Sequence, residues 1–168
     1  DTDALRATGC AWNGREAWAF PMKDANRRVV GIRLRNNAGQ KWAVRGSHAG
    51  LFYPNEQPTN DTLYIVEGPT DTAAALTLGV SALGRPQCVG QEEMIVSYVK
   101  SNRFRRVAIL SDNDRNNAGL KGAQKLSSML PVLNCIFVLP TKDIREFVNF
   151  GGNLTLLNSM TKDLVWKK

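Results

Sequence analysis

The segment "VEGPTDTAAAL", residues 66–76, follows an apolar run and places a single carboxylate where a predicted buried strand turns into a helix. The apolar run "TLYIV" leads into it, and Glu67 stands at the turn that follows. A carboxylate at the end of a buried strand is unfavourable unless a partner compensates its charge. The segment therefore predicts either a structural partner for Glu67 or a bound cation.

Strand-like and helix-like segments alternate from residue 62 onward. The apolar runs are 62–67, 80–84, 106–112 and 135–140, and helical patterns occupy 70–78, 91–102, 117–130 and 143–150. This alternation is typical of an α/β fold with a parallel sheet of about four strands flanked by helices. In such sheets, ligands bind at the carboxyl ends of the strands.

Acidic residues follow three of the four predicted strands. Glu67 ends the first strand, Asp112 and Asp114 follow the third, and Asp143 follows the fourth, while Asp71 lies one helical turn after Glu67. Carboxylates that converge at one edge of a sheet repel each other unless a cation or a proton intervenes. Because magnesium prefers oxygen ligands and is often held by one or two carboxylates, the pattern predicts a metal ion.

The chain before residue 61 has a different residue composition and hydrophobic pattern. The segments 17–24, 28–36 and 40–47 carry β-branched and aromatic residues and are separated by turn residues. They predict a small antiparallel β subdomain over residues 1–60, in which Trp12, Trp18 and Trp42 are expected to form the core rather than base-stacking platforms. Residues 53–61 have the composition of a linker, residues 61–150 form the predicted α/β domain, and residues 151–168 are expected to be a helical extension.

The net charge of +7 favours a polyanionic partner. Seven of the basic residues lie between positions 23 and 45, where Asp24 is the only acidic residue. Within and beyond this strip, the side chains expected to contact triphosphate or a nucleic-acid backbone are Arg33, Lys41, Arg45 and Lys142, with Arg35 as a further candidate. His48 stands in a loop of the same region and carries no assigned role.

Composition excludes several classes of protein. No apolar run approaches the roughly 20 residues that span a bilayer, and no secretory signal pattern is present, so a cytoplasmic protein is expected. Three widely spaced cysteines and a single histidine, His48, argue against a structural zinc site or a disulfide framework. The chain begins at Asp1 rather than Met, so a fragment of a larger protein is expected.

The segment "DNDRNNAG", residues 112–119, has two other interpretations that its residues do not support. An EF-hand loop needs Gly at its sixth position and Glu at its twelfth, where this chain has Asn117 and Ala123. In aspartate-nucleophile phosphatases a Thr or Val follows two residues after the second Asp, where this chain has Asn116.

Taken as a set, three motifs resemble the Toprim domain. They are Glu-Gly-x-x-Asp at 67–71, Asp-x-Asp at 112–114 and "PTKDIREFV" at 140–148. The segments 20–36 and 39–54 resemble the β subdomain that precedes Toprim in DnaG-type and phage primases. The resemblance covers most of the chain and implies a Toprim fold preceded by a small antiparallel β subdomain.

The resemblance also implies roles for the acidic residues. Glu67 is the expected general acid/base or metal ligand, Asp112 and Asp114 are expected to hold magnesium, with manganese as an alternative, and Asp71 and Asp143 support the metal cluster. Many members of the family carry an acidic residue where this chain has Arg145. A full complement of metals is therefore not implied.

The function implied is that of a DNA primase catalytic core, a nucleotidyltransferase that uses magnesium to synthesise short RNA primers for DNA replication. Its expected partners are a single-stranded DNA template, ribonucleoside triphosphates, and zinc-binding and helicase domains or proteins outside this chain, in a bacterial or phage-infected cell. Two alternatives remain: a Toprim nuclease, and a nucleic-acid-binding module with a degenerate metal site. A topoisomerase is disfavoured, because its tyrosine nucleophile lies in a domain for which this chain has no room.

Overall fold

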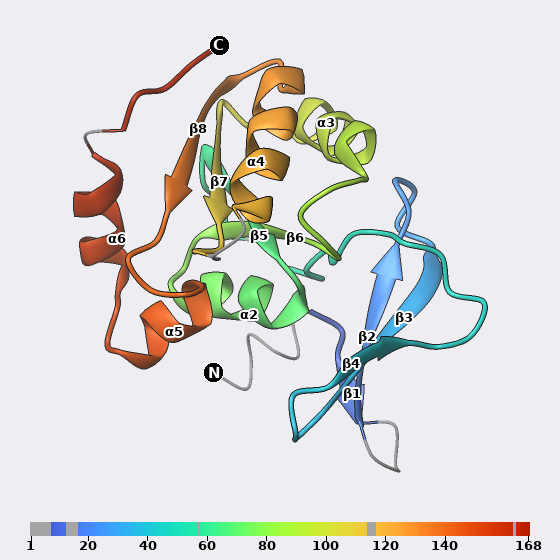
Figure 1. The fold of residues 1–168 in the computed structure, drawn as a ribbon. Coiled ribbons are helices and arrows are strands. Elements are labelled where there is room, and N and C mark those ends of the chain that lie inside the picture. The colour runs from blue at the N-terminus through green and yellow to red at the C-terminus, as the bar shows by residue number, and fades with distance from the viewer. Residues whose placement is uncertain (1–7, 13–16, 57, 114–116, 163) are drawn as a thin grey trace.

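Two four-stranded sheets lie side by side in the molecule (Figure 1). The computed structural model describes residues 8–12, 17–56, 58–113, 117–162 and 164–168. The first sheet is antiparallel, in the order β1-β2-β3-β4, and the second is parallel, in the order β6-β5-β7-β8. The expected fold class, a parallel sheet with helices preceded by a small antiparallel sheet, is confirmed.

The antiparallel sheet contains β1 (Ala11–Trp12), β2 (Ala17–Lys23), β3 (Val29–Asn36) and β4 (Lys41–Ala43). The short strand β1 was not expected from the sequence. Asp24 forms the tight turn between β2 and β3, because its Oδ1 accepts the backbone N–H groups of Asn26 and Arg28 at 2.9 Å each. At the β2 end near this turn, Phe20 and Met22 pack with Phe52 in a small apolar cluster.

The prediction that the tryptophans form the core of this sheet was wrong. Trp12 and Trp18 are each 42% exposed, and Trp42 is 37% exposed. The cluster around Phe20 is too small to cover the whole sheet, so the rows of side chains farther from it stay open to solvent.

The parallel sheet contains β5 (Thr62–Glu67), β6 (Ser81–Arg85), β7 (Arg106–Ser111) and β8 (Leu133–Val138). Successive side chains of a strand point to opposite faces. Leu63 and Ile65 of β5 accordingly enter one core, and Tyr64 and Val66 enter the other. Both faces of the sheet are therefore buried, as expected for a parallel sheet.

Helices cover both faces of the parallel sheet (Figure 1). One face packs against α2 (Pro69–Thr77), α5 (Ile144–Asn149) and α6 (Leu154–Thr161), and the other packs against α3 (Glu92–Ser101) and α4 (Ala118–Met129). The four helices predicted from the sequence agree with α2, α3, α4 and α5 to within one residue at each end.

The strand order creates a crevice between β5 and β7. The chain leaves β5 through α2 on one face and leaves β7 through α4 on the opposite face. Such a topological switch point is where ligands bind in open α/β sheets. Glu67 and Asp112, which end or follow these two strands, therefore stand at the expected binding edge.

Residues 51–53 lock the two sheets together. Leu51 exchanges two backbone hydrogen bonds of 2.9 Å with Lys23, and Phe52 exchanges bonds of 2.8 and 3.1 Å with Gly84 of β6. Tyr53, the first residue of the expected linker, is buried in the core beneath α3. These contacts hold one face of the small sheet toward the carboxyl end of the parallel sheet.

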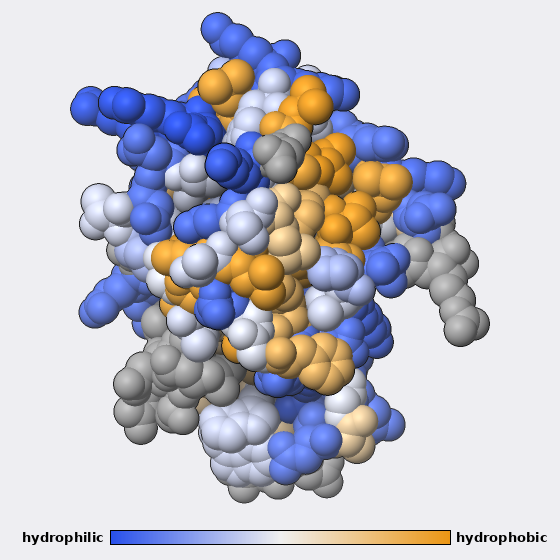
Figure 2. Space-filling view, turned by 90° about the vertical axis from the view of Figure 1, so that its left-hand side faces the viewer, coloured by the Kyte–Doolittle hydropathy of each residue, from blue (hydrophilic) through white to orange (hydrophobic). Residues whose placement is uncertain are grey.

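The C-terminal segment packs on the edge of the parallel sheet. Leu157 of α6 is fully buried, and the backbone of Lys167 pairs with Asn134 of β8. Apolar side chains gather on this side of the molecule (Figure 2), and the large exposed ones are Leu133, Val138, Phe150, Leu154, Leu156 and Val165. None of the helices in the described residues is both long and apolar enough to cross a membrane.

A substitution at Gly122 tests how closely α4 packs against the loop that follows β6. A Cβ at this position would clash with the carbonyl oxygen of Cys88, so Gly122→Ala must displace the helix or the loop. We expect the free energy of unfolding to fall by about 2 kcal/mol, as measured by urea denaturation. Lys121→Ala, on the exposed side of the same helix, is the control and should change it by less than about 0.5 kcal/mol. Equal effects of the two variants would contradict this packing.

Candidate active site

A cleft of ≈ 150 Å³ lies between the antiparallel sheet and the carboxyl end of the parallel sheet. Acidic side chains, together with Lys142 and Arg145, line it on the side of the parallel sheet, and basic side chains line it on the side of the small sheet. The charged lining residues are Arg33, Arg35, Lys41, Glu67, Asp71, Asp112, Lys142, Asp143 and Arg145. Eight of these nine were candidates from the sequence, and Arg145 was noted there only as a departure from the family.

One basic candidate does not take part in the described cleft. Arg45 is exposed and is not among the lining residues, and the same holds for His48, to which the sequence assigned no role. Asp114 lies outside the described residues, so its predicted role as a metal ligand stays a prediction.

A buried arginine is the structural partner of Glu67. Glu67 and Arg85 are register partners on the parallel strands β5 and β6, and Nη2 of Arg85 lies 3.3 Å from Oε1 of Glu67. Arg85 is only 1% exposed, and its Nη1 donates a 2.7 Å hydrogen bond to the carbonyl of Cys88. Gly119 of α4 packs close to the end of β7, since a Cβ there would lie 2.9 Å from Oγ of Ser111. Sequence analysis missed Arg85, because strand order and register are not readable from local patterns.

A second arginine lies between two other carboxylates, Asp71 and Asp143. Nε of Arg145 lies 2.8 Å from Oδ1 of Asp71, and its Nη2 binds Oδ2 of Asp143. Asp143 also caps α5, because its Oδ1 accepts the backbone N–H of Glu146 at 2.9 Å. Arg145 thus joins the start of α2 to the start of α5.

The two carboxylates that Arg145 bridges differ in pKa. Burial raises the pKa of Asp71 to about 6, although the positive charge of Arg145 opposes this rise. Burial also acts to raise the pKa of Asp143, but the Glu146 N–H and the Arg145 guanidinium outweigh it and hold that pKa below its ordinary value. Both groups are therefore mainly ionised at neutral pH, with Arg145 as their shared counter-ion.

Burial and neighbouring negative charges both disfavour the ionised form of Asp112. Burial, followed by the negative charges of Glu67, Asp71 and Asp143, raises the pKa of Asp112 to about 7. None of the side chains that the structure describes forms a hydrogen bond or ion pair with its carboxylate. The loop that carries it is nevertheless held in place, because the N–H of Asn113 donates a 3.0 Å hydrogen bond to the carbonyl of Lys142.

These oxygen ligands fit one magnesium ion better than several. Over the described ranges, no group of three or more His, Cys, Asp and Glu side chains is arranged to hold a metal. Asp71 and Asp143 are both bound to Arg145, whereas Glu67, which pairs with Arg85 of the neighbouring strand, and Asp112 stand at the switch point. Two carboxylates are a usual protein contribution to a magnesium site, in which water and phosphate supply the other ligands. A cation there would also relieve the repulsion on Asp112.

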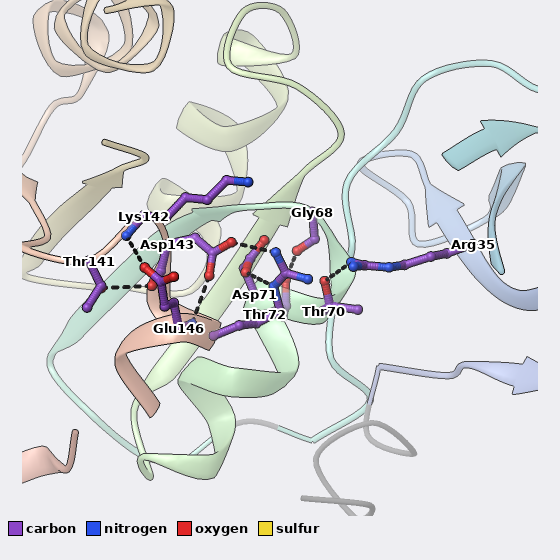
Figure 3. Close-up of polar contacts among 10 residues, drawn as sticks. Arg35, Gly68, Thr70, Asp71, Thr72, Thr141, Lys142, Asp143 and Glu146 are labelled. Atoms are coloured by element: carbon purple, nitrogen blue, oxygen red, sulfur yellow. Dashed lines mark hydrogen bonds and ion pairs between the residues drawn. The ribbon is translucent and has the colours of Figure 1, made fainter. Parts of the chain in front are cut away.

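The basic side of the cleft comes mainly from β3 and β4. Arg33, Arg35 and Lys41 share one face of the small sheet by their register, and Nη1 of Arg35 donates a 3.1 Å hydrogen bond to Oγ1 of Thr70 on α2 (Figure 3). Nε of Arg33 is buried without a hydrogen-bond partner among the described atoms. Lys142 approaches from the loop after β8. An anion entering this cleft would find several cationic donors.

Solved structures with the same architecture are primases. A DnaG catalytic core is 20% identical, with a TM-score of 0.69 over 98% of this chain and 60% of its own. A DnaG primase catalytic domain bound to single-stranded DNA is also 20% identical, with a TM-score of 0.68 over 98% of this chain and 59% of its own.

A third similar structure comes from bacteriophage T7. It shows the lagging-strand DNA polymerase interacting with primase domains of two gp4 subunits, bound to an RNA/DNA hybrid and dTTP. The matched chain of that assembly is 17% identical, with a TM-score of 0.75 over 98% of this chain and 88% of its own.

This chain has the fold of a primase catalytic core. The primase-core fold is what these proteins share with it, and the chain spans about three fifths of the length of the DnaG chains that it matches. Neither a family model nor a curated protein matches the sequence.

Removing Arg145 should destabilise the protein. Arg145→Gln leaves Asp71 and Asp143 buried without their counter-ion, so we expect a loss of about 2 kcal/mol or more in the free energy of unfolding at pH 7.5. The loss should shrink at pH 5, because Asp71, whose pKa is about 6, becomes protonated there. Arg105→Gln is the control, since that arginine and its partner Asp61 are 80% and 69% exposed. Urea denaturation at both pH values measures the effect, and a loss no larger than that of the control would contradict it.

Asp112→Asn should stabilise the metal-free protein in a pH-dependent way. The pKa of Asp112 is about 7 in the folded state against an ordinary value of 3.8, so wild-type stability falls as pH rises through this window. The amide cannot ionise, so the variant should match wild type near pH 4 and exceed it above pH 7, by on the order of 1–2 kcal/mol after solvent screening. Urea denaturation in EDTA measures the difference, with exposed Asp61→Asn as the control. A difference that is independent of pH would refute the assignment.

Proposed function

We propose that this chain is the catalytic core of a DNA primase, which uses magnesium to synthesise short RNA primers on single-stranded DNA. The observation that carries the proposal is one cleft with carboxylates on one side and arginines and lysines on the other. Nucleotidyl transfer needs both groups of charges, because a metal must be held by oxygen ligands and a triphosphate must be held by cations.

The basic side chains would bind the triphosphate of the incoming nucleotide. Arg33 supports this role because its buried Nε lacks a partner among the described residues, as expected for a donor that faces an anionic ligand. Arg35 is oriented by Thr70, and Lys41 lies beside it on β4. Lys142 would approach the phosphates from the opposite side of the cleft.

The acidic side chains Glu67 and Asp112, together with Asp114, would hold magnesium, with manganese as an alternative. When bound, the ion neutralises charge on the reacting phosphate and on the departing pyrophosphate. In the reaction the 3′-hydroxyl oxygen bonds to the α-phosphorus, the bond to the pyrophosphate oxygen breaks, and a carboxylate such as Glu67 accepts the hydroxyl proton. Arg85, on the neighbouring strand β6, would keep Glu67 in place for this role.

The similar proteins support the choice of substrates. One of the DnaG domains is bound to single-stranded DNA, and the T7 assembly is bound to an RNA/DNA hybrid and dTTP. An Aquifex aeolicus primase structure contains a zinc-binding domain beside the RNA polymerase domain, and the T7 primase is part of a primase-helicase protein. We infer that this chain acts with comparable domains or proteins, in the cytoplasm of a bacterial or phage-infected cell.

A second candidate function is that of a nucleic-acid-binding module without catalysis. The ion pairs of Arg145 favour it, because they occupy two of the five carboxylates that the sequence assigned to a metal cluster. A Toprim nuclease is disfavoured by the basic antiparallel sheet, which cleavage by the carboxylates alone would not need. One experiment separates the three functions.

The protein is incubated with magnesium, labelled ribonucleoside triphosphates and circular single-stranded DNA, and both the label and the DNA are analysed. A primase converts the label into short RNA chains and leaves the circle intact. A nuclease linearises the circle, and a binding module leaves both label and circle unchanged while retarding the DNA in a gel. Either of the last two outcomes would overturn the proposed function.

Glu67→Gln should reduce primer synthesis roughly a hundredfold at saturating nucleotide, because an amide can neither accept the hydroxyl proton nor offer the metal a full charge. It should also lower stability, because buried Arg85 loses its counter-ion. Asp112→Asn separates the two effects, since its turnover should fall similarly while its metal-free stability rises. Glu93→Gln, on the exposed first turn of α3, is the control. Full turnover in Asp112→Asn, with unchanged manganese binding by electron paramagnetic resonance, would refute the metal site.

A further inference from the structure

Two exposed tryptophans lie side by side on the antiparallel sheet. Trp12 of β1 and Trp18 of β2 are register partners, their ring centroids are 5.3 Å apart, and the ring planes meet at 67°. Each side chain is more than two fifths exposed, although tryptophan is among the side chains that gain most from burial. Neither residue has a role in the site described above.

The register of the sheet places this pair on the side that faces the cleft. Directly opposed residues of antiparallel strands point to the same face, so the row Trp12, Trp18, Arg35 and Lys41 shares one face. Arg35 and Lys41 line the cleft. Adjacent strands lie about 4.8 Å apart, so Trp18 is one strand and Trp12 two strands away from the backbone of Arg35. The tryptophans therefore extend the basic side of the cleft outward.

Trp42 has the opposite orientation. It pairs with Leu34, which lies between Arg33 and Arg35 on β3 and so points to the other face. Trp42 is nearly as exposed as Trp12 and Trp18. The chain thus contains a tryptophan of similar exposure, on the same sheet, that cannot reach a ligand leaving the cleft on the Trp18 side.

The chemistry of this row matches single-stranded nucleic acid. Proteins bind single strands by stacking bases on aromatic rings and by placing cations along the phosphates. An apolar protein partner would instead have to bury Arg35 and Lys41 without matching charges, which is unfavourable. The net charge of +7 adds attraction for a polyanion.

We propose that Trp12 and Trp18, continued by Arg35 and Lys41, form a base-stacking platform that holds single-stranded DNA where it enters the cleft. The platform rests on the proposed function, because it supplies the template strand to that site. Its binding step needs no metal and no nucleotide, so it can be measured independently of primer synthesis.

The test measures the affinity for a fluorescein-labelled oligodeoxythymidylate of about 16 nucleotides by anisotropy, in EDTA. Trp18→Ala should weaken binding roughly tenfold, since stacking of one base contributes on that order. Trp18→Phe, which keeps an aromatic face, should recover most of the affinity, whereas Trp18→Leu should not. Trp42→Ala, the matched control on the opposite face, should bind as wild type does.

Two further measurements assign the loss to stacking. An abasic strand of the same length should bind wild type and Trp18→Ala equally, because it has phosphates but no bases. The salt dependence of thymidylate binding should be unchanged in Trp18→Ala but flatter in Lys41→Ala, which removes a phosphate contact. Circular dichroism confirms that each variant is folded.

The outcomes distinguish the platform from the proposed function. Unchanged affinity in both Trp18→Ala and Trp12→Ala, an equal loss in Trp42→Ala, or an equal loss with the abasic strand would overturn the platform, even if primers are made. A tenfold loss confined to the cleft-facing tryptophans supports the platform, even if the protein makes no primers and the primase proposal fails.

Discussion

Mutual repulsion among carboxylates at the carboxyl edge of the parallel sheet is the constraint on which this site depends. Glu67, Asp71, Asp112 and Asp143 line one cleft, and like charges in a partly buried site need cations between them. Arg85 compensates Glu67 from inside the sheet, and Arg145 compensates Asp71 and Asp143 from the start of α5. Asp112 is left with its pKa raised to about 7 by burial and by the neighbouring carboxylates.

Arg85 and Arg145 also connect elements of the fold to one another. Arg85 connects Glu67 to the carbonyl of Cys88, and that carbonyl packs against Gly122 of α4. Arg145 connects α2 to α5 through their first turns. The positions of the carboxylates are therefore coupled to the packing of helices on both faces of the sheet. A change in either arginine should alter the fold and the site together.

The antiparallel sheet supplies three cationic side chains that face the carboxylates of the parallel sheet. Its cleft-facing side carries Arg33, Arg35 and Lys41 opposite the carboxylates, and the same face continues to Trp18 and Trp12. The junction at Leu51 and Phe52 holds this face in position. Exposed tryptophans are thus followed by basic side chains that face the carboxylates across the cleft, an order that suits a nucleic-acid strand entering the proposed nucleotidyl-transfer site.

The sequence by itself determined the elements and most of the charged candidates of the cleft. Hydrophobic alternation identified the strands and helices of the parallel domain, because burial on both faces leaves a clear local pattern. Acidic residues at strand ends were recognisable for the same reason, since they interrupt apolar runs at fixed places. Four of the nine charged residues described in the lining of the cleft were named in this way, and four basic ones were named from the clustering of positive charge and the resemblance, with Arg45 as the one basic candidate that lies elsewhere.

Only the tertiary structure decided which charges neutralise each other and which aromatic residues are buried. Arg85 meets Glu67 because β6 pairs with β5 in a particular register, and Arg145 reaches Asp71 across 74 positions of sequence. The tryptophans looked like core residues because their strands alternate as core strands do, yet the sheet buries only the end of its face near Phe52. Register, strand order and the extent of a shared core are properties of the assembled chain, and local sequence patterns do not encode them.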